Sequence, residues 1–324
     1  MKTLTRLITA AALMLASCAP MTAVAEYPTK PVRIVVPLTA GGPGDIVTRA
    51  VAQRLSVAFG KPFYVENMGG ANMNIGGDFV ARAEPDGHTL MMMSTPMLIS
   101  PALYANMNYH PIRDFAPVSM IASFPLILIA NKSMPFKTVP ELVAYAKQHP
   151  NELNYGSSGT GSSTHLAGEL FASMSGTKLV HVPYRGINEA VMNLIGGQIQ
   201  LSFAGAPIAI PNADQGKVVA LASTSPQRSP RLPQIPTIAE NGLPGYDVTP
   251  WYGIVAPAKT PPEVIKRLHE EIAKIMQTDA IREQWASLGA DPSASASTEA
   301  FGKLMQKELE MWDRIVKDAK ISIN

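Results

Sequence analysis

The chain has 324 residues, of which 46% are hydrophobic and only 16% are charged. This composition is that of a folded protein long enough for two domains, and it excludes general disorder. Lys and Arg number 27 against 25 Asp and Glu, a formal net charge of +2 with no block of one sign, so nucleic acid is not an expected partner.

The chain begins with the three parts of a secretory signal. Lys2 and Arg6 give a positive start, and the apolar stretch over residues 7–16 is too short to span a bilayer. Small residues at 23–25 then offer a cleavage site. We therefore expect residues 1–25 to be a signal peptide and the mature protein to be periplasmic.

The only cysteine, Cys18, lies in this segment and ends the run Leu15-Ala16-Ser17-Cys18. The run resembles a bacterial lipobox, whose cysteine is acylated and becomes the new N-terminus. A lipid anchor at Cys18 and a cysteine discarded with the signal peptide are both compatible with the sequence. In either case no disulfide is expected, and no later segment has the roughly 18 apolar residues of a membrane helix.

Beyond the signal, strand-like and helix-like segments alternate. A β-branched run over 32–37 leads through a glycine-rich loop into a helical pattern over 46–59, with Asp45 as the predicted N-cap and Gly60 at the end. Further strands are expected over 63–66, 88–94, 154–155, 179–182, 198–203 and 218–223. An apolar run covers 121–130. Further helices are expected over 138–149, 164–174 and 298–320. Such alternation predicts an α/β fold with parallel strands.

Two glycine-rich loops each join the end of a predicted strand to the start of a predicted helix. The first covers residues 39–44 and the second residues 156–163. In such loops successive backbone N–H groups point into one concavity, and the helix behind adds a partial positive charge. Ligand crevices lie at the carboxyl ends of parallel strands. The loops therefore predict two seats for a carboxylate, without any side-chain cation.

Seven segments, spread over the whole mature chain, resemble a known family. They are Tyr27-Pro28-Thr29-Lys30-Pro31-Val32-Arg33, Val36-Pro37 through Ala40-Gly41-Gly42 to Asp45, Asn67 to Gly70, Pro85-Asp86-Gly87, Tyr155 to His165, His181-Val182-Pro183-Tyr184-Arg185-Gly186 and Trp251-Tyr252-Gly253. In these segments and their order the sequence resembles the Bug/TctC family, the extracytoplasmic solute-binding components of tripartite tricarboxylate transporters. The resemblance implies a type II periplasmic-binding-protein fold, in which two Rossmann-like lobes joined by crossing hinge strands close over a small carboxylate.

The resemblance also implies domain boundaries and partners. We expect residues 26–123 plus 250–324 to form lobe one and residues 124–249 to form lobe two. The implied partners are the carboxylate ligand and the membrane subunits of a tripartite tricarboxylate transporter, and we expect a monomer. A periplasmic sensor subunit that presents its liganded form to a signalling protein needs the same closure, so this alternative stays open.

The family motifs place candidate ligand-binding residues in both loops. They are Thr39, Ala40, Gly41, Gly42 and Asp45 in the first loop, and Ser157, Ser158, Thr160, Gly161, Ser162 and Ser163 in the second. Their backbone N–H groups and hydroxyls would serve as donors. For Asp45 the role of helix cap is favoured over direct ligand contact. Thr95, Pro96 and Met97 follow the strand over 88–94 on the same edge, where pocket lining and ordinary packing are both open.

A departure from the family pattern bears on the ligand class. Many relatives follow the strand over 198–203 with an aspartate that could receive a ligand ammonium group, whereas this chain continues Ala204-Gly205-Ala206-Pro207. An unpaired ammonium in a closed cleft would be costly to desolvate, so an amino acid is not expected. With Phe203 as an apolar wall and Gly205 beside it, a dicarboxylate or an aromatic or alicyclic carboxylate fits better.

An enzymatic or cofactor-dependent function is not expected. Ser162 and His165 stand three residues apart, but no nucleophile-elbow motif surrounds the serine. The run from Gly42 to Val47 lacks the last glycine of a dinucleotide fingerprint, and no phosphate-loop lysine follows either loop. The histidines are dispersed without a metal-binding motif. We therefore predict no catalytic residue, no metal and no cofactor, and a hydrolase or transferase is the disfavoured third class.

Overall fold

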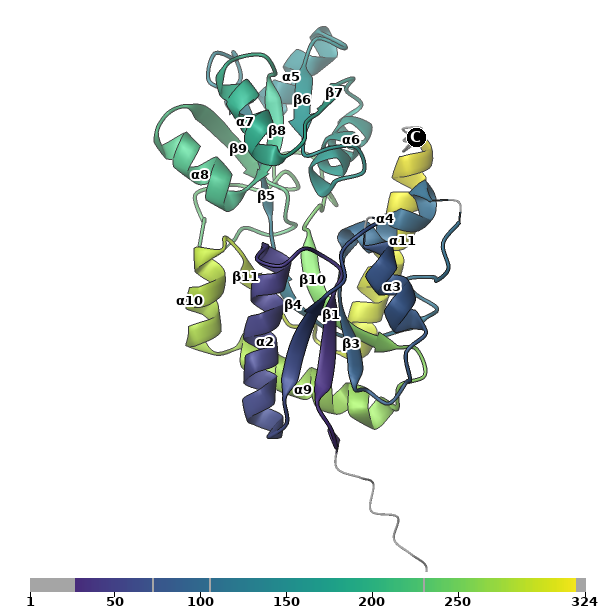
Figure 1. The fold of residues 1–324 in the computed structure, drawn as a ribbon. Coiled ribbons are helices and arrows are strands. Elements are labelled where there is room, and N and C mark those ends of the chain that lie inside the picture. The colour runs from purple at the N-terminus through teal and green to yellow at the C-terminus, as the bar shows by residue number, and fades with distance from the viewer. Residues whose placement is uncertain (1–26, 72, 105, 230, 319–324) are drawn as a thin grey trace, which may run out of the picture.

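The computed structural model describes residues 27–71, 73–104, 106–229 and 231–318 (Figure 1). The predicted signal peptide and Cys18 lie outside the described residues. Figure 1 shows two bodies, a lower and an upper one, each with a sheet covered by helices. The α/β class predicted from the sequence is confirmed.

The lower body is built on a sheet with the strand order β11-β4-β10-β3-β1-β2. Its strands are β1 (Val32–Val36), β2 (Phe63–Asn67), β3 (Thr89–Ser94), β4 (Phe115–Ser123), β10 (Trp251–Pro257) and β11 (Asp291–Pro292). Strand β1 runs parallel to β2 and β3, whereas β10 runs antiparallel to β3 and β4. The methionines Met91, Met92 and Met93 of β3 are fully buried, as expected of a strand that is covered on both faces.

The upper body is built on a sheet with the order β7-β6-β8-β5-β9. Its strands are β5 (Leu126–Asn131), β6 (Asn154–Ser157), β7 (Val180–Pro183), β8 (Leu201–Gly205) and β9 (Val218–Ser223). Strand β6 is parallel to β7 and β8, whereas β5 is antiparallel to β8 and β9. The expected parallel pairing therefore holds for only part of each sheet, because the strands that follow the crossings between bodies, β5 and β10, run against their neighbours.

Helices connect the strands and cover both sheets (Figure 1). They are α2 (Pro43–Phe59), α3 (Asn74–Ala81), α4 (Thr95–Leu103), α5 (Val139–Gln148), α6 (Ser163–Ser175), α7 (Ile187–Ile195), α8 (Ala206–Asp214), α9 (Pro262–Met276), α10 (Asp279–Ser287) and α11 (Thr298–Asp318). The predicted end of α2 at Gly60 is confirmed, since Gly60 has a φ of 63° and forms the left-handed C-cap.

The chain crosses between the two bodies in two places. The apolar run over 121–130 reads as one segment in the sequence, but β4 ends at Ser123 and β5 begins at Leu126 in the other sheet. The return crossing covers residues 224–250, between β9 and β10. Strand β10 is not among the strands expected from the pattern of hydrophobic residues. We call these two stretches, 124–125 and 224–250, the crossing segments.

Hydrogen bonds tie the crossing segments together. Phe124 N donates to Pro250 O at 2.7 Å. The hydroxyl of Thr224, a fully buried residue, accepts from Leu126 N at 2.9 Å and donates to Val248 O at 2.6 Å. A single hydroxyl thus bridges the two passages of the chain.

Replacing Thr224 with Val removes this hydroxyl and keeps the shape of the side chain. The Leu126 N–H and the Val248 carbonyl would each lose a buried partner, so we expect the free energy of unfolding to fall by about 1–3 kcal/mol. Thr224→Ser, which keeps the hydroxyl, is the matched control and should lose less. Chemical denaturation measures both variants, and equal losses would mean that the hydroxyl is not the stabilising group.

Candidate functional site

The first glycine loop, between β1 and α2, is held by a buried carboxylate. Helix α2 begins at Pro43 with Gly42 at its N-cap, so the prediction of Asp45 as the N-cap is wrong by three residues. A proline fits the first turn because it needs no N–H partner there. The Asp45 side chain instead turns back, and its Oδ2 accepts from Gly41 N at 2.9 Å and from Arg49 Nε at 3.0 Å.

Asp45 stays ionised although it is only 3% exposed. Burial raises its pKa, but hydrogen bonds from Arg49, Gly41 and Asn67 outweigh that effect and hold the pKa below its usual value. Asn67 Nδ2 donates to Asp45 Oδ1 at 2.9 Å, so both carboxylate oxygens are occupied. This carboxylate therefore braces the loop and offers no donor to an anion.

The second glycine loop, between β6 and α6, uses several of its own donors. Ser158 N donates to Thr164 Oγ1 and Gly159 N to Ser157 Oγ, at 2.9 and 3.1 Å. Gly161 N donates to His165 Nδ1 and Ser162 N to Gly159 O, at 3.1 and 3.2 Å. Ser162 is the N-cap of α6, and its Oγ accepts from His165 N at 3.3 Å. The next two N–H groups, of Ser163 and Thr164, have no partner within the helix because they belong to its first turn.

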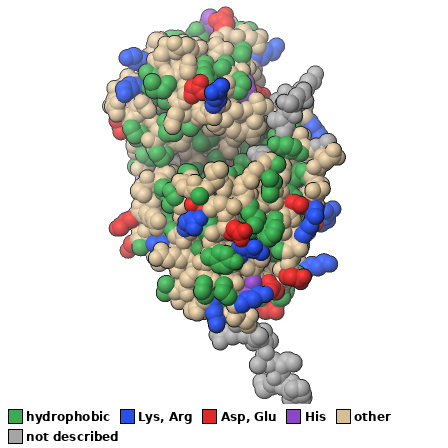
Figure 2. Space-filling model, viewed as in Figure 1, with side chains coloured by type: hydrophobic (Ala, Val, Ile, Leu, Met, Phe, Trp, Pro, Cys, Tyr) green, Lys and Arg blue, Asp and Glu red, His purple; other side chains and the backbone are tan. Residues whose placement is uncertain are grey.

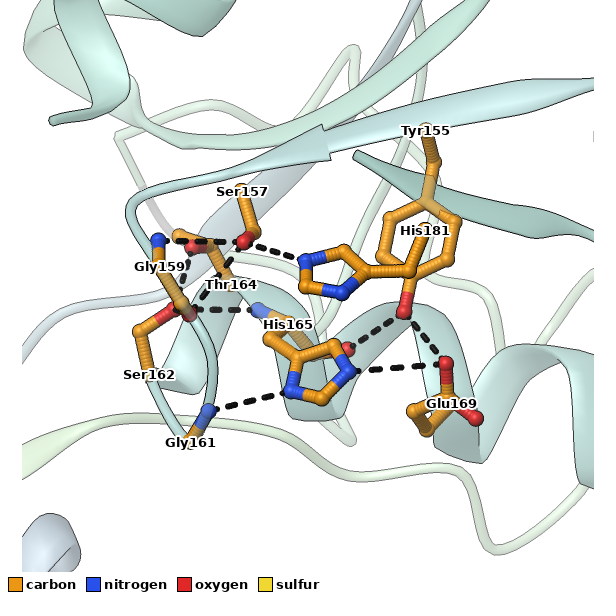
Figure 3. A network of polar contacts seen from close by, with 9 residues as sticks. All are labelled: Tyr155, Ser157, Gly159, Gly161, Ser162, Thr164, His165, Glu169 and His181. Carbon is orange, nitrogen blue, oxygen red and sulfur yellow. Dashed lines mark hydrogen bonds and ion pairs between the residues drawn. The ribbon is translucent and has the colours of Figure 1, made fainter. Parts of the chain in front are cut away.

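Two stacked imidazoles lie beneath the second loop (Figure 3). The rings of His165 and His181 have centroids 3.8 Å apart. His181 Nε2 lies 2.6 Å from Ser157 Oγ, and His165 Nε2 lies 3.6 Å from Glu169 Oε1. Burial, together with the neighbouring His165, lowers the pKa of His181 to about 4. His181 is therefore uncharged at neutral pH.

These contacts do not form a catalytic dyad. Ser162 Oγ donates to Gly159 O at 2.6 Å, while His165 Nδ1 accepts from Gly161 N. Ser162 thus caps helix α6, and His165 accepts a hydrogen bond from the loop. These two roles account for their spacing in the sequence. Ser157, the serine that does contact an imidazole, is fully buried and is not presented to a substrate.

A cavity of about 490 Å³ lies between the second loop and α4. It is lined by Pro96, Leu103, Tyr104, Ser158, Thr160, Gly161, Ser162, Ser163 and Thr164. Pro96 and five residues of the second loop are among the candidates predicted from the sequence. Thr164 belongs to the same segment but is not among the candidates. Leu103 and Tyr104 are not candidates either, because they belong to no motif and reach the loop only through the tertiary fold. Within the described part of the chain, the lining carries no charged side chain.

The other predicted site residues lie outside this cavity. Three of them are fully buried, namely Ser157, Met97 and Phe203. Gly205 is the N-cap of α8, and Thr95 is 2% exposed, with no described partner for its buried Oγ1. Residues 39–42 belong to the lower body. Figure 2 shows a hollow between the bodies, bordered mainly by apolar and uncharged polar surface.

A larger cavity, of about 800 Å³, lies beside the crossing segments, between α10, α11, β11 and residues 225–229 and 231. None of the predicted site residues lines it. It contains Glu308 of α11, whose Oε1 accepts from Trp251 Nε1 at 2.9 Å. Burial raises the pKa of Glu308 to about 8, against the lowering effect of that hydrogen bond. The nearby carboxyl of Asp247 adds to the increase.

Neither a metal centre nor a membrane span is found in the described ranges. No three of their His, Cys, Asp and Glu side chains are grouped so that they could hold a metal ion. None of their helices combines the length and the apolar character that a bilayer crossing requires.

Comparison with known proteins assigns the chain to a family. The family described as "Tripartite tricarboxylate transporter family receptor", or TctC, matches residues 47–321. The chain belongs to this receptor family. Protein BugT of Bordetella pertussis is similar to it, with 32% identity over 294 residues that cover 90% of each chain. The resemblance drawn from the seven sequence segments is thereby confirmed.

Solved structures of TctC-type receptors are similar in fold. R. palustris Rpa4515 with adipate is 35% identical with a TM-score of 0.73, covering 92% of this chain and 100% of that one. MatC from Rhodopseudomonas palustris with bound malate is 30% identical with a TM-score of 0.69, covering 90% and 100%. A TctC solute-binding protein from Polaromonas without ligand is 27% identical with a TM-score of 0.83, covering 90% and 99%. The predicted periplasmic-binding-protein fold is confirmed.

The TctC family consists of extracytoplasmic receptors that bind small carboxylates and work with the membrane components of a transporter. Family and fold are those of solute-binding receptors rather than enzymes, so the prediction of a non-enzymatic function is also confirmed.

The buried carboxyl of Glu308 should make the stability of this TctC receptor depend on pH. The folded state keeps the Glu308 proton up to about pH 8, whereas an unfolded glutamate loses it near pH ~4.3. Between these values the folded state binds more protons, so the contribution of this group to the free energy of unfolding falls as pH rises.

Glu308→Gln should remove that part of the pH dependence and keep an acceptor for the Trp251 indole. We expect the variant to gain stability relative to the wild type as pH rises from about 5 to about 8, by a few kcal/mol. Urea unfolding of both proteins at the two pH values measures the gain. Stability curves that stay parallel would contradict the buried-carboxyl explanation.

Proposed function

We propose that this receptor binds a small dicarboxylate, or an aromatic or alicyclic carboxylate, in the cleft between its two bodies and delivers it to the membrane subunits of a tripartite tricarboxylate transporter. The observation that carries the proposal is the start of α6 at the wall of the 490 Å³ cavity. The N–H groups of Ser163 and Thr164 and the positive end of the helix dipole attract an anion there.

Such an anion-binding site can reach useful affinity without a cationic side chain. Hydrogen bonds to a charged group contribute about 1.5–3 kcal/mol each. A few of them amount to about 8 kcal/mol, the level of a micromolar ligand. The hydroxyls of Thr160 and Ser163 on the cavity wall add further donors.

The bodies correspond to the two lobes of the proposal. Sheet membership supports residues 26–123 plus 250–324 as lobe one, which holds β1 to β4, β10 and β11, and residues 124–249 as lobe two, which holds β5 to β9. The hydrogen-bonded crossing segments would act as the hinge. The mature protein would be a periplasmic monomer, released by cleavage after residue 25 or anchored at Cys18.

We also propose that the structure is the open form of the receptor. The ligand-free Polaromonas protein is less identical in sequence to this chain than the adipate and malate complexes are. Its structure is nevertheless more similar, with a TM-score of 0.83 against 0.73 and 0.69 for the two complexes. An open hinge also accounts for the separation of the first loop from the 490 Å³ cavity. Closure would bring residues 39–42 onto the ligand and complete the site.

The uncharged wall of the cavity supports a ligand without an ammonium group. No acidic side chain is among the described lining residues, so an amino acid would leave its ammonium unpaired. The ligands in two similar structures, adipate and malate, are carboxylates without an amine. Leu103 and Pro96 supply apolar surface for the hydrocarbon part of such a ligand.

Isothermal titration calorimetry of the mature protein with adipate, malate, benzoate and aspartate tests this function. We expect at least one of the first three to bind with micromolar affinity or better, and aspartate to bind at least about tenfold more weakly, which corresponds to about 1.4 kcal/mol. If none of the four binds, the proposed function is wrong. If aspartate binds best, the assigned ligand class is wrong.

Substitution of Gly42 tests the contribution of the first loop. A Cβ added there would meet only Thr39 O, at 3.9 Å, so the fold should accept larger side chains. Gly42→Leu should weaken binding by at least about tenfold because it would fill the face of the closing loop, while Gly42→Ala should weaken it less. Melting temperatures near that of the wild type would show that both variants fold. Unchanged affinity in Gly42→Leu would remove the first loop from the site.

A further inference from the structure

The two glycine loops share one structural device. In each loop a glycine in the left-handed region donates its N–H to the side chain four residues later, on the following helix. Gly41, with a φ of 83°, donates to Asp45 Oδ2 at 2.9 Å, and Gly161, with a φ of 78°, donates to His165 Nδ1 at 3.1 Å. A side-chain acceptor at this position is therefore a common requirement of both loops, met by a carboxylate in one and an imidazole in the other.

The hydrogen bonds determine the tautomer of His165. Because its Nδ1 accepts from Gly161 N, that nitrogen carries no proton, and the ring proton of the neutral imidazole is on Nε2. Nε2 faces Glu169 Oε1 at 3.6 Å, and the same oxygen accepts from Tyr155 OH at 2.5 Å. Glu169 and Tyr155 thus orient the ring so that Nδ1 points at the loop (Figure 3).

The second imidazole supports the other end of the loop. His181 stacks on His165 and contacts Ser157 Oγ at 2.6 Å, and this Oγ accepts from Gly159 N at 3.1 Å. His165 is 3% exposed. The pair therefore supports the loop from below, with the buried ring of His165 at one end and the partly buried ring of His181 at the other.

We propose that His165 is a positioning residue for carboxylate binding: it holds the Gly161 N–H inward, so that the free N–H groups of Ser163 and Thr164 stay aimed into the cavity. This inference rests on the proposed function. The imidazole braces the loop without adding a negative charge next to the anion. In the first loop the corresponding acceptor, the Asp45 carboxylate, is anionic, and Arg49 neutralises it.

Two substitutions at His165 distinguish the effect of its hydrogen-bond acceptor from the effect of side-chain packing. Asn places its Oδ1 close to the position of Nδ1 and cannot be protonated, whereas Leu fills the space without an acceptor. We expect His165→Leu to weaken binding of adipate, or of malate if adipate does not bind, by at least about tenfold, as expected when a preorganised loop loses its support. His165→Asn should stay within about threefold of the wild type, about 0.7 kcal/mol.

His149 provides a matched control. Like His165 it stacks on a tyrosine, Tyr145, and contacts a glutamate, Glu152, but it follows α5, and none of these contacts involves the second loop. His149→Asn should bind as the wild type does. Amide hydrogen exchange at Gly161, followed by NMR, gives a readout independent of affinity, and it should be faster in His165→Leu than in His165→Asn or the wild type.

If the wild type binds and His165→Leu binds equally well, or if the Gly161 amide exchanges at the same rate in both proteins, the positioning role is wrong and the proposed function stands. Should His165→Leu not fold, His165→Ala, which also lacks the acceptor, takes its place in both measurements. If the wild type binds no carboxylate, the proposed function fails, and the inference with it.

Discussion

The two passages of the chain between its bodies constrain the rest of the structure. Both depend on the buried hydroxyl of Thr224, which bridges Leu126 and Val248. Within the described residues, these segments are where the chain passes from one sheet to the other, and one cluster of buried side chains, which includes Met97, Phe203 and Trp312, extends across both bodies. In the proposed receptor the crossing segments would form the hinge. The same arrangement brings Pro96 of α4 and Ser163 of α6, residues of different bodies, to one cavity. The proposed hinge and the proposed binding cleft would thus both follow from one topology.

In the proposed function, the cleft recognises an anion through backbone geometry rather than through opposite charge. A helix start keeps its first N–H groups unpaired, and a glycine loop can point them at one place. A flexible loop would lose this advantage because its ordering would cost conformational entropy on binding. Here the loops bond to themselves and to a side chain four residues later, Asp45 in one and His165 in the other. In the proposed mode of binding, residues that do not touch the ligand thus position the loops that do.

Much of the fold was accessible from local pattern, and the failures have physical causes. The buried methionines of β3, the C-cap of α2 at Gly60 and the location of α6 follow from apolar runs and glycines. The strand β10 is not among the predicted strands, and the division of 121–130 enters only through the lobe boundary after residue 123 that the family resemblance implies, because hydrophobic periodicity does not encode which sheet a strand joins. Asp45 was placed at the N-cap because its residue type prefers that position, but Pro43 allowed the helix to start earlier and the carboxylate turned back to Gly41.

The sequence by itself determined the α/β class, the two glycine loops and the family, because these depend on residue types at fixed local spacings. It also identified six of the residues that line the 490 Å³ cavity, since glycine and hydroxyl residues at a strand-to-helix turn have few other uses. Only the tertiary structure placed Leu103 and Tyr104 opposite the second loop and stacked His165 on His181. These contacts join segments far apart in the chain or in different bodies, and they arise from how the sheets and helices pack, which no local pattern records.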